Sequence, residues 1–546
     1  MRRVALAAVL VALATAASAA PQSQWRITKT EWSEDDEKGF SAFVGAIGES
    51  GCNHTVECLR DPANPYRDTD PRGFRFVSDC ADLPYMLRAY YAWKNGLPFG
   101  YVDGVSGRGG SGDIRYTKGN KPEGRRAIVD NGGLSGPSLM WEVHEGVSSA
   151  TFRTDAAQTK GILPDFYSPK VQPGSIRPGT AIYDVNGHVA IVYKIEDDGR
   201  VHYMDAHPDH TLTRSVYGAQ FGQSPARLGG GFKNWRPLRL VGAKARKDGS
   251  LVGGRLVYAK NDEIVDFSLE QYTGNVEGTH GDGASAQFEY SGIPLGYFEY
   301  VRVAVSGGKM TYNPVAELKG TMRTLCNDLK DRYLAVEAAF TANIHKKKQP
   351  SRLPDNIYGT DSMEWEIYST PSRDARIKTA FVQFGRDLAR YIQMWVERDS
   401  RIVYDGLFLK EDLQKNYEEI SESCRVLYYN SAGVPVILTF DDMMRRLFKM
   451  SFDPYHCIER RWGATSEEEL ASCPDDRTKR RWYEAEQRLR NQIDRRYDQA
   501  MSFTVQDLEE RAEGSGVDEP PPADIKAVID AVGARVAFDG MKPVGQ

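Results

Sequence analysis

The chain has 546 residues, too many for one hydrophobic core, which predicts two or three domains. Its 70 basic and 75 acidic residues give a formal net charge of −5, so it lacks the basic excess of a nucleic-acid-binding protein, and we expect no nucleic-acid partner. Hydrophobic residues make up 41%, which is ordinary for a soluble globular protein. Beyond the N-terminus no apolar run approaches the roughly 18 residues of a membrane-spanning helix.

The N-terminus has the pattern of a secretory signal peptide. Arg2 and Arg3 precede an apolar run from Val4 to Ala14, and the small residues Ala17-Ser-Ala19 follow. Such a segment is recognised for export and then removed. We therefore expect residues 1–20 to be a signal peptide, and the mature protein to reach the periplasm or the cell exterior without a membrane anchor.

The seven cysteines fit an oxidising compartment, where disulfides persist. An odd number leaves one thiol unpaired. Pairing neighbours in the sequence and in the C-terminal region leaves Cys80 alone, although sequence by itself does not fix connectivity. The candidates for disulfides are Cys52 with Cys58, Cys326 with Cys424, and Cys457 with Cys473.

Residues 21–245 are predicted to form an α+β domain. A polar loop ending in Ser78-Asp79-Cys80 runs into an apolar segment that predicts a buried helix, ending at Asn95-Gly96. The Gly-rich stretch 100–136 predicts a long mobile loop. Short strands over 181–183, 188–195 and 201–205 predict an antiparallel sheet against the helix that carries Cys80.

Beyond residue 245 the sequence pattern predicts two further regions. Residues 246–318 predict a strand and loop extension of the first domain or a small linker domain. Beyond residue 319 the periodicity is helical, and this C-terminal domain could hold a protein partner. The clearest helical spacing joins Trp482, Leu489, Ile493, Ala500 and Phe503.

Cys80 and His188 are the candidate nucleophile and base. A thiol at the start of a helix lies where the helix dipole stabilises a thiolate, and the N–H groups there can form an oxyanion hole next to Ser78 and Asp79. His188 opens a strand after an Asn-Gly turn, and strand alternation lets its imidazole face the Cys80 helix. A base needs a polar group to orient it. We expect Asp205 in that role, with His207 as the alternative.

A metal site is the alternative interpretation of the residues around Asp205. His202, Asp205, His207, Asp209 and His210 lie close together in the sequence, but they lack the helical His-x-x-x-His spacing of zinc enzymes. Pro208 and Asp209 fit a turn better than a ligand loop. We therefore expect neither a metal nor another cofactor.

Two motifs resemble a known superfamily. Ser78-Asp79-Cys80-Ala-Asp-Leu and Arg177-Pro-Gly-Thr-Ala-Ile-Tyr-Asp-Val-Asn-Gly-His188-Val-Ala-Ile-Val are similar, in order and character, to the NlpC/P60 and CHAP families of papain-like cysteine peptidases and amidases. The resemblance covers about residues 70 to 210. It implies a papain-like fold, Cys80 as nucleophile, His188 as base, Asp205 or His207 as third member, and peptide or amide bonds of cell-wall peptidoglycan as substrate.

Two residues depart from the family pattern. Asp82 places an acidic group near the thiol, which would raise the pKa of Cys80. Pro84 does not fit a regular helix that includes Cys80, so the helix could instead begin at Asp82 with Pro84 in its first turn. Two alternatives to a hydrolase stay open: a catalytically silent cell-envelope binding protein on the same scaffold, and a transglutaminase-like acyltransferase, because His188 and Asp205 lie across a hairpin.

Overall fold

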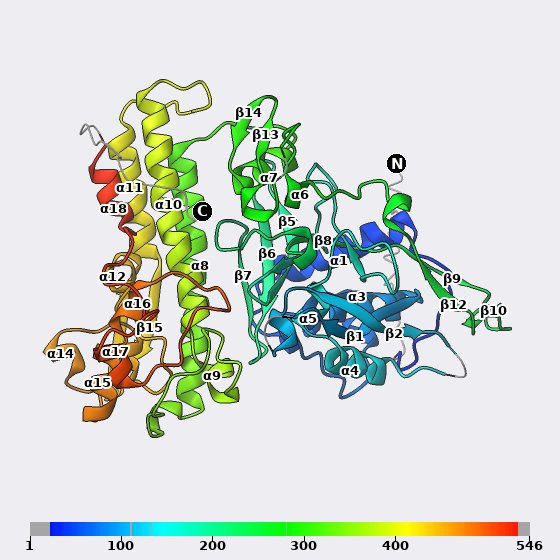
Figure 1. Ribbon diagram of the computed structural model, residues 1–546, viewed down its shortest axis with the longest axis horizontal. Coiled ribbons are helices and arrows are strands. Elements are labelled where there is room, and N and C mark those ends of the chain that lie inside the picture. The colour runs from blue at the N-terminus through cyan, green and yellow to red at the C-terminus, as the bar shows by residue number, and fades with distance from the viewer. Residues whose placement is uncertain (1–21, 110–111, 131–132, 280, 533–546) are drawn as a thin grey trace, which may run out of the picture.

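The computed structural model describes residues 22–109, 112–130, 133–279 and 281–532. The predicted signal peptide, residues 1–20, and residues 533–546 of the expected C-terminal domain lie outside the described residues. A sheet-containing part and a bundle of long helices lie side by side, with residues of both parts in contact along one boundary (Figure 1).

A six-stranded antiparallel sheet organises the first part, with strand order β3-β8-β4-β5-β6-β7. The three predicted strands are its centre, and the α+β class is confirmed at that level. In the register, Asp184 of β4 pairs with His188 of β5, and Val192 of β5 pairs with Tyr203 of β6. The strands are β3 (Phe166–Tyr167), β4 (Ala181–Asp184), β5 (His188–Ile195), β6 (Val201–Ala206), β7 (Leu212–Val216) and β8 (Gly231–Trp235).

Helices cover both faces of this sheet. On one face, α1 (Glu34–Glu49) and α3 (Asp82–Asn95) share a hydrophobic core with Val189 and Ile191 of β5. On the other face, α7 (Tyr297–Val305) shares a core with Ala190 and Val192. The alternation of β5 therefore separates two cores, as expected for a strand that is apolar on both sides.

Helix α3 begins at Asp82, not at Cys80. Pro84 lies in its first turn, where its missing N–H costs no hydrogen bond. The helix ends at Gly96, whose left-handed φ of 65° is the geometry of the predicted stop. The expected Cys-bearing helix is thus corrected: Cys80 lies in the turn just before a buried helix.

The Gly-rich stretch is not a long loop. Most of it forms an antiparallel hairpin of β1 (Phe99–Gly107) and β2 (Asn120–Ile128), whose register shifts at Gly104. Glycine composition indicated a loop, but a bulged hairpin tolerates glycine as well. Around the hairpin and α3 lie α2 (Thr55–Arg60), α4 (Gly136–Gly146) and α5 (Ser149–Phe152).

Residues 246–318 pack on the sheet domain. Residue 245, the expected domain end, lies in β10, which pairs with β11 across that point. Phe288 and the helix α7 complete the second core of the sheet. The elements are β9 (Leu238–Val241), β10 (Lys244–Ala245), β11 (Leu251–Val252), β12 (Arg255–Tyr258), α6 (Glu270–Thr273), β13 (Phe288–Tyr290) and β14 (Ile293–Leu295).

The C-terminal region is mainly helical, as predicted. Its core lies between α8 (Pro314–Thr341), α10 (Pro371–Val396), α11 (Leu409–Ser423) and α18 (Ile525–Asp530), which run side by side. A hairpin of β15 (Arg425–Tyr429) and β16 (Pro435–Thr439) joins them. The shorter helices are α9 (Met363–Tyr368), α12 (Phe440–Arg446), α13 (Ile458–Arg461), α14 (Glu467–Leu470), α15 (Arg477–Ala485), α16 (Gln487–Asn491) and α17 (Val505–Glu509).

The helix expected through Phe503 stops early. The chain forms α15 and α16 and leaves helical geometry after Asn491. Trp482, Leu489 and Phe503 are nevertheless buried in one core. Ile493 is half-buried and Ala500 is exposed, so the apolar spacing located three of the five expected core side chains and not the end of the helix. Short 3₁₀ turns complete the chain: η1 (Arg67–Thr69), η2 (Ile114–Tyr116), η3 (Ala226–Leu228), η4 (Asn261–Glu263), η5 (Gly283–Ser285) and η6 (Ile344–Lys346).

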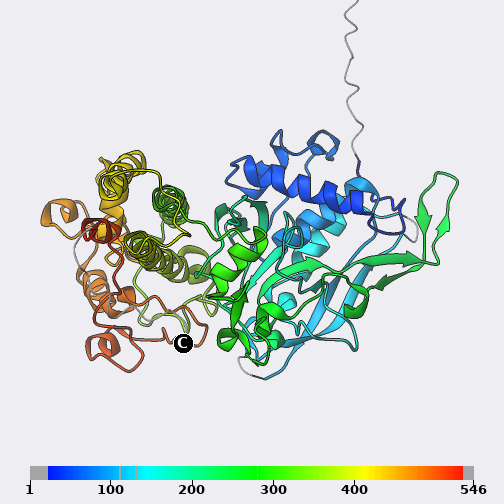
Figure 2. The same ribbon diagram turned by 90° about the horizontal axis from the view of Figure 1, so that it is seen from above.

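The two parts meet along the edge strand β7. Helix α8 packs against this strand, and Figure 2 shows the long helices next to the sheet domain from above. Within the described residues no helix is both long and apolar enough to cross a membrane.

The three predicted disulfides are confirmed: Cys52–Cys58, Cys326–Cys424 and Cys457–Cys473. Cys80 is the one free cysteine among the described residues.

We expect the Cys326–Cys424 bridge to carry much of the stability of the helical bundle. It joins α8 to the end of α11 across 98 residues, and closing a long loop restricts the unfolded chain. Replacing both cysteines by alanine should lower the free energy of unfolding by about 2–4 kcal/mol. Thermal unfolding measures this. The Cys52→Ala/Cys58→Ala pair, which opens a separation of only 6 residues, is the control. Equal losses from both pairs would contradict the loop argument.

Candidate active site

His188 and Asp205 form a hydrogen-bonded pair across neighbouring strands. The His188 Nε2 lies 2.5 Å from Asp205 Oδ2. His188 opens β5, and Asp205 is near the end of β6, so the antiparallel register brings both side chains to the same face. Because a carboxylate accepts the proton of Nε2, the free lone pair of the neutral ring is on Nδ1. Nδ1 makes no hydrogen bond within the described part of the chain.

Asp205 is held from three directions. Besides His188, its Oδ1 accepts a hydrogen bond from the Thr213 hydroxyl at 2.5 Å, and its Oδ2 lies 3.4 Å from the Arg376 guanidinium of α10. Burial alone would raise the pKa of Asp205, but the bond from His188 and the charge of Arg376 more than offset this and hold the pKa far below its usual range. The carboxylate is therefore ionised. Thr213 and Arg376 had no signal in the sequence.

The imidazole of His188 is neutral at pH 7. Burial lowers the pKa of His188, and the Arg376 cation lowers it further, although the Asp205 charge acts in the opposite direction. A neutral imidazole with a free lone pair on Nδ1 can accept a proton.

His207 does not bind His188. Its Nε2 lies 3.1 Å from the Thr213 hydroxyl and 3.8 Å from Asp205 Oδ2, and its ring stacks on that of His188 at 6.0 Å between centroids. Burial, with nearby arginines, holds the pKa of His207 well below its ordinary value. Of the two expected third members, Asp205 is the direct partner of His188, and His207 is one step removed.

The Cys80 thiol lies beside the start of β5. The backbone N–H of Val189, the residue after His188, interacts with the sulfur, and Cys80 packs on the core that contains α3 and Val189. His188 itself alternates with Val189 and belongs to the opposite face, with Asp205. Our expectation that the imidazole faces the helix after Cys80 is therefore corrected. Within the described residues no hydrogen bond joins the sulfur to either ring nitrogen of His188.

The resting thiol is protonated. Burial raises the pKa of Cys80 well above its ordinary value, and the charges of Asp79, Asp82 and Asp205 raise it further, while the Val189 N–H only partly opposes them. Cys80 also precedes α3, where the dipole field is weaker. The predicted thiolate is thus wrong for the resting structure, and the effect expected of Asp82 is confirmed.

Asp79 occupies most of the expected oxyanion hole. Its Oδ1 accepts the N–H groups of Ala81 at 2.8 Å and Asp82 at 3.2 Å, and its carbonyl oxygen accepts that of Leu83. Ser78 is buried and its hydroxyl donates to the Asp79 carbonyl. These donors serve the first turn of α3, so they are not available to a substrate. In the described loop, the Cys80 N–H is left without a hydrogen-bond partner.

A second histidine lies next to the nucleophile loop. His144 of α4 forms a short hydrogen bond through Nδ1 to Asp82 Oδ2. Burial and the Asp79 charge raise the pKa of Asp82 to about 8, and the bond from Asp82 raises the pKa of His144. The pair therefore retains a proton at neutral pH. The exposed Trp141, one helical turn earlier, lies 5.3 Å from the His144 ring. Sequence reasoning missed His144 because it is 62 residues from Asp82 and has no motif of its own.

The residues considered as zinc ligands do not converge on one point, because each has a different hydrogen-bond partner. His202 binds Glu196 at 3.0 Å, and His210 lies 3.2 Å from the Ser78 carbonyl oxygen. Asp209 accepts the hydroxyl and the N–H of Thr211, closing the turn after β6. A different set, Asp453, His456 and Glu486, brings ligand atoms together inside the helical region. Both ring nitrogens of His456 already bind Ser451 and the Lys479 carbonyl, and Arg490 lies 3.7 Å from Glu486, so this set fits a buried polar network better than a cation site.

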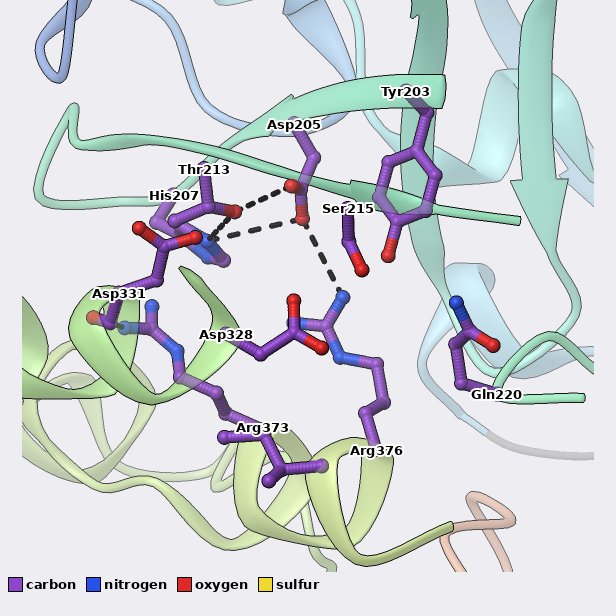
Figure 3. Close-up of a pocket in the computed structure, with 11 residues that line it drawn as sticks. Tyr203, Asp205, His207, Thr213, Ser215, Gln220, Asp328, Asp331, Arg373 and Arg376 are labelled. Atoms are coloured by element: carbon purple, nitrogen blue, oxygen red, sulfur yellow. Dashed lines mark hydrogen bonds and ion pairs between the residues drawn. The ribbon is translucent and has the colours of Figure 1, made fainter. Parts of the chain in front are cut away.

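A polar cavity of about 40 Å³ lies behind Asp205, between the sheet domain and the helical region. Figure 3 shows Asp205 and His207 on one side of it, and Asp328 and Arg376 on the other. This volume suits a few water molecules and not a substrate. The cavity is lined by Tyr203, Asp205, His207, Thr213, Ser215, Gln220, Asp328, Asp331, Arg373, Arg376 and Ile377.

Comparison with known proteins gives no relative: no protein family matches this chain, and no curated protein or solved structure matches it significantly. The similarity to NlpC/P60 and CHAP enzymes therefore rests on the two sequence motifs.

We expect Asp79→Asn to make the thiol more reactive. The charge of Asp79 is the largest electrostatic cause of the raised pKa of Cys80, and an asparagine keeps the oxygen that caps α3. The rate of alkylation by iodoacetamide at pH 8 should rise roughly threefold to tenfold. Asp68→Asn, which removes an exposed charge elsewhere, is the control. An unchanged rate would mean that burial alone sets the thiol pKa.

Proposed function

We propose that this protein is an exported cysteine hydrolase of papain-like type that cuts peptide or amide bonds, with cell-wall peptidoglycan as its substrate. Cys80 is the nucleophile, His188 the base and Asp205 the orienting group. The observation that carries the proposal is the His188–Asp205 pair at the start of β5, directly before Val189, whose backbone N–H interacts with the one free thiol of the described chain. The three disulfides support an oxidising compartment. Peptidoglycan comes from the motif resemblance.

The charges favour a general-base mechanism. Because Cys80 is a thiol and His188 is neutral, the sulfur proton moves to His188 Nδ1 as the sulfur attacks the carbonyl carbon. The carbon–nitrogen bond then breaks, and His188 gives this proton to the leaving amine. Water adds to the thioester, with its proton passing through His188. The carboxylic acid leaves and the thiol is restored.

This mechanism needs a movement that brings the thiol and the His188 imidazole, which belong to opposite faces of β5, into contact. No hydrogen bond joins the thiol to His188 in the described structure, and catalytic contacts are often longer before substrate binds. The Cys80 N–H is the donor of this loop left for the substrate carbonyl oxygen. Substrate that binds this N–H would sit against both Cys80 and the start of β5.

The silent binding protein remains the second candidate, favoured by two observations. The thiol pKa is raised, and Asp79 occupies the N–H groups of Ala81 and Asp82. A transglutaminase-like acyltransferase shares the thioester and differs only in the group that releases it.

The test is product analysis in heavy-oxygen water. The mature oxidised protein is incubated with purified peptidoglycan sacculi in H₂¹⁸O, with and without glycinamide as an amine acceptor. A hydrolase gives fragments that carry one ¹⁸O in a new carboxyl group. An acyltransferase gives glycinamide conjugates without ¹⁸O. Binding to sacculi without any new product would refute both enzymes and support the binding protein.

A further inference from the structure

Two arginines of the helical region reach the strands that carry the candidate site. Arg376 of α10 lies 3.4 Å from Asp205 Oδ2, the same oxygen that binds His188. Arg495, which follows α16, lies 2.6 Å from Asp184 Oδ2. Asp184 ends β4 and pairs with His188 in the register of the sheet. The two contacts are therefore on either side of His188, one on each neighbouring strand.

The turn that leads into His188 is fixed from the same side. Gly187 has a φ of 87°, and a Cβ added there would lie 2.7 Å from the Tyr116 hydroxyl. The Tyr116 ring stacks on Tyr497 of the helical region, with centroids 3.4 Å apart and planes within 9°. The Asn-Gly turn is thus packed against one tyrosine that is itself packed against the C-terminal region.

Both arginine–aspartate contacts are largely shielded from solvent. The side chains of Arg495 and Asp184 are 9% and 1% exposed, and those of Arg376 and Asp205 are 16% and 2% exposed. Buried charged contacts of this kind are geometrically specific, and removing one partner leaves an uncompensated charge. A helical region that only tethered the protein to a partner would not need charges aimed at the neighbours of His188.

We propose that Arg376 and Arg495 are positioning residues of the active site, so that the helical region that carries them is required for catalysis. This rests on the proposed function for its role in catalysis, but not for its effect on His188. Arg376 fixes the carboxylate that selects the His188 tautomer, and Arg495 fixes the end of β4 that pairs with His188 (Figure 3 shows the first contact).

Two acidic residues of α8 compete only weakly with Asp205 for Arg376. Asp328 lies next to Arg376 and Asp331 next to Arg373 in the cavity lining (Figure 3), and neither forms an ion pair within the described residues. Burial raises the pKa of Asp328 to about 7 and that of Asp331, with help from the Asp328 charge, to about 8. Near neutral pH Asp331 is therefore mostly protonated and Asp328 about half protonated, which weakens their competition with Asp205 for Arg376. The charged or titratable groups around His188 are Cys80, Asp184, Asp205, His207, Asp328, Asp331, Arg373, Arg376 and Arg495.

The test compares Arg376→Gln with a matched arginine of the same helix. Arg390 also lies on α10 and binds Glu299 of α7 at 2.8 Å, but it is far along the helix from Arg376. The full mature chain carries ¹³C-labelled histidine, and NMR follows the His188 signal against pH. Because the Arg376 charge lowers the pKa of His188, Arg376→Gln should raise its titration midpoint. Arg390→Gln should leave it unchanged, and Arg376→Lys should stay near the wild type.

The activity readout separates this inference from the proposed function. In Arg376→Gln, kcat/KM near pH 6 should fall roughly tenfold, with the acid limb moved to higher pH and KM little changed. Arg495→Gln should lower kcat without moving the titration midpoint of His188. This second variant tests the inference if Arg376→Gln does not fold. If the wild type shows no hydrolysis but Arg376→Gln still moves the His188 midpoint, the proposed function is refuted and the positioning of His188 stands. An unmoved midpoint in folded Arg376→Gln, or a gain in activity, would overturn the inference.

Discussion

Cys80→Ala should abolish hydrolysis, with kcat/KM at least about 10³-fold below the wild type. The thiol is the one free cysteine of the described chain and lies next to the residue that follows His188. Alanine removes the sulfur on which the thioester forms, so no acyl intermediate can accumulate. The measurement is the rate of release of ¹⁸O-labelled fragments from sacculi, together with intact-mass analysis of the protein for an acyl adduct.

His188→Ala should have an effect of similar size, because a thiol with a raised pKa needs a base to become nucleophilic. The double variant Cys80→Ala/His188→Ala should be no worse than either single variant, since the two groups act as a unit. The Cys52→Ala/Cys58→Ala pair, which removes a short-loop disulfide and leaves Cys80 in place, is the control and should keep activity. Full hydrolysis by Cys80→Ala would exclude the cysteine mechanism.

The sequence was sufficient for local features that depend on neighbouring residues. The strands around His188, the three disulfides, the stop at Gly96 and the helical C-terminal region were all predicted. Each follows from short-range rules: strand periodicity, cysteine arithmetic, a left-handed glycine and helical spacing. Asp205 was also predicted, as the first choice over His207 among the polar residues on one face of the next strand.

The features that the sequence did not reveal depend on contacts between segments that are far apart in the chain. The thiol was expected to be ionised, but three carboxylates and burial act on it, and their distances are fixed only by folding. Asp79 was expected beside an oxyanion hole, yet its own side chain binds the donors. Arg376 is 171 residues from Asp205, and a single arginine on an amphipathic helix has no feature that marks its partner.

Asp205→Asn should lower kcat/KM by about 10²–10⁴-fold while keeping the fold. Asp205 accepts from His188, Thr213 and Arg376 at once, and an asparagine offers one oxygen and a second group that can only donate. The neutral side chain can no longer stabilise the imidazolium that forms during catalysis. It also leaves Arg376 as an uncompensated cation next to His188. Asp209→Asn, in the turn after β6, is the matched control.

The sign of the pH effect distinguishes this residue from Arg376. The Asp205 charge raises the pKa of His188 and the Arg376 charge lowers it. Asp205→Asn should therefore move the His188 midpoint and the acid limb of kcat/KM to lower pH, and Arg376→Gln should move both to higher pH. In the double variant both charges are gone, so the midpoint should return toward the wild type while kcat stays low. Shifts of the same sign in the two single variants would mean that they act through unfolding of the site and not through charge, and the His188–Asp205–Arg376 arrangement would then have no electrostatic role.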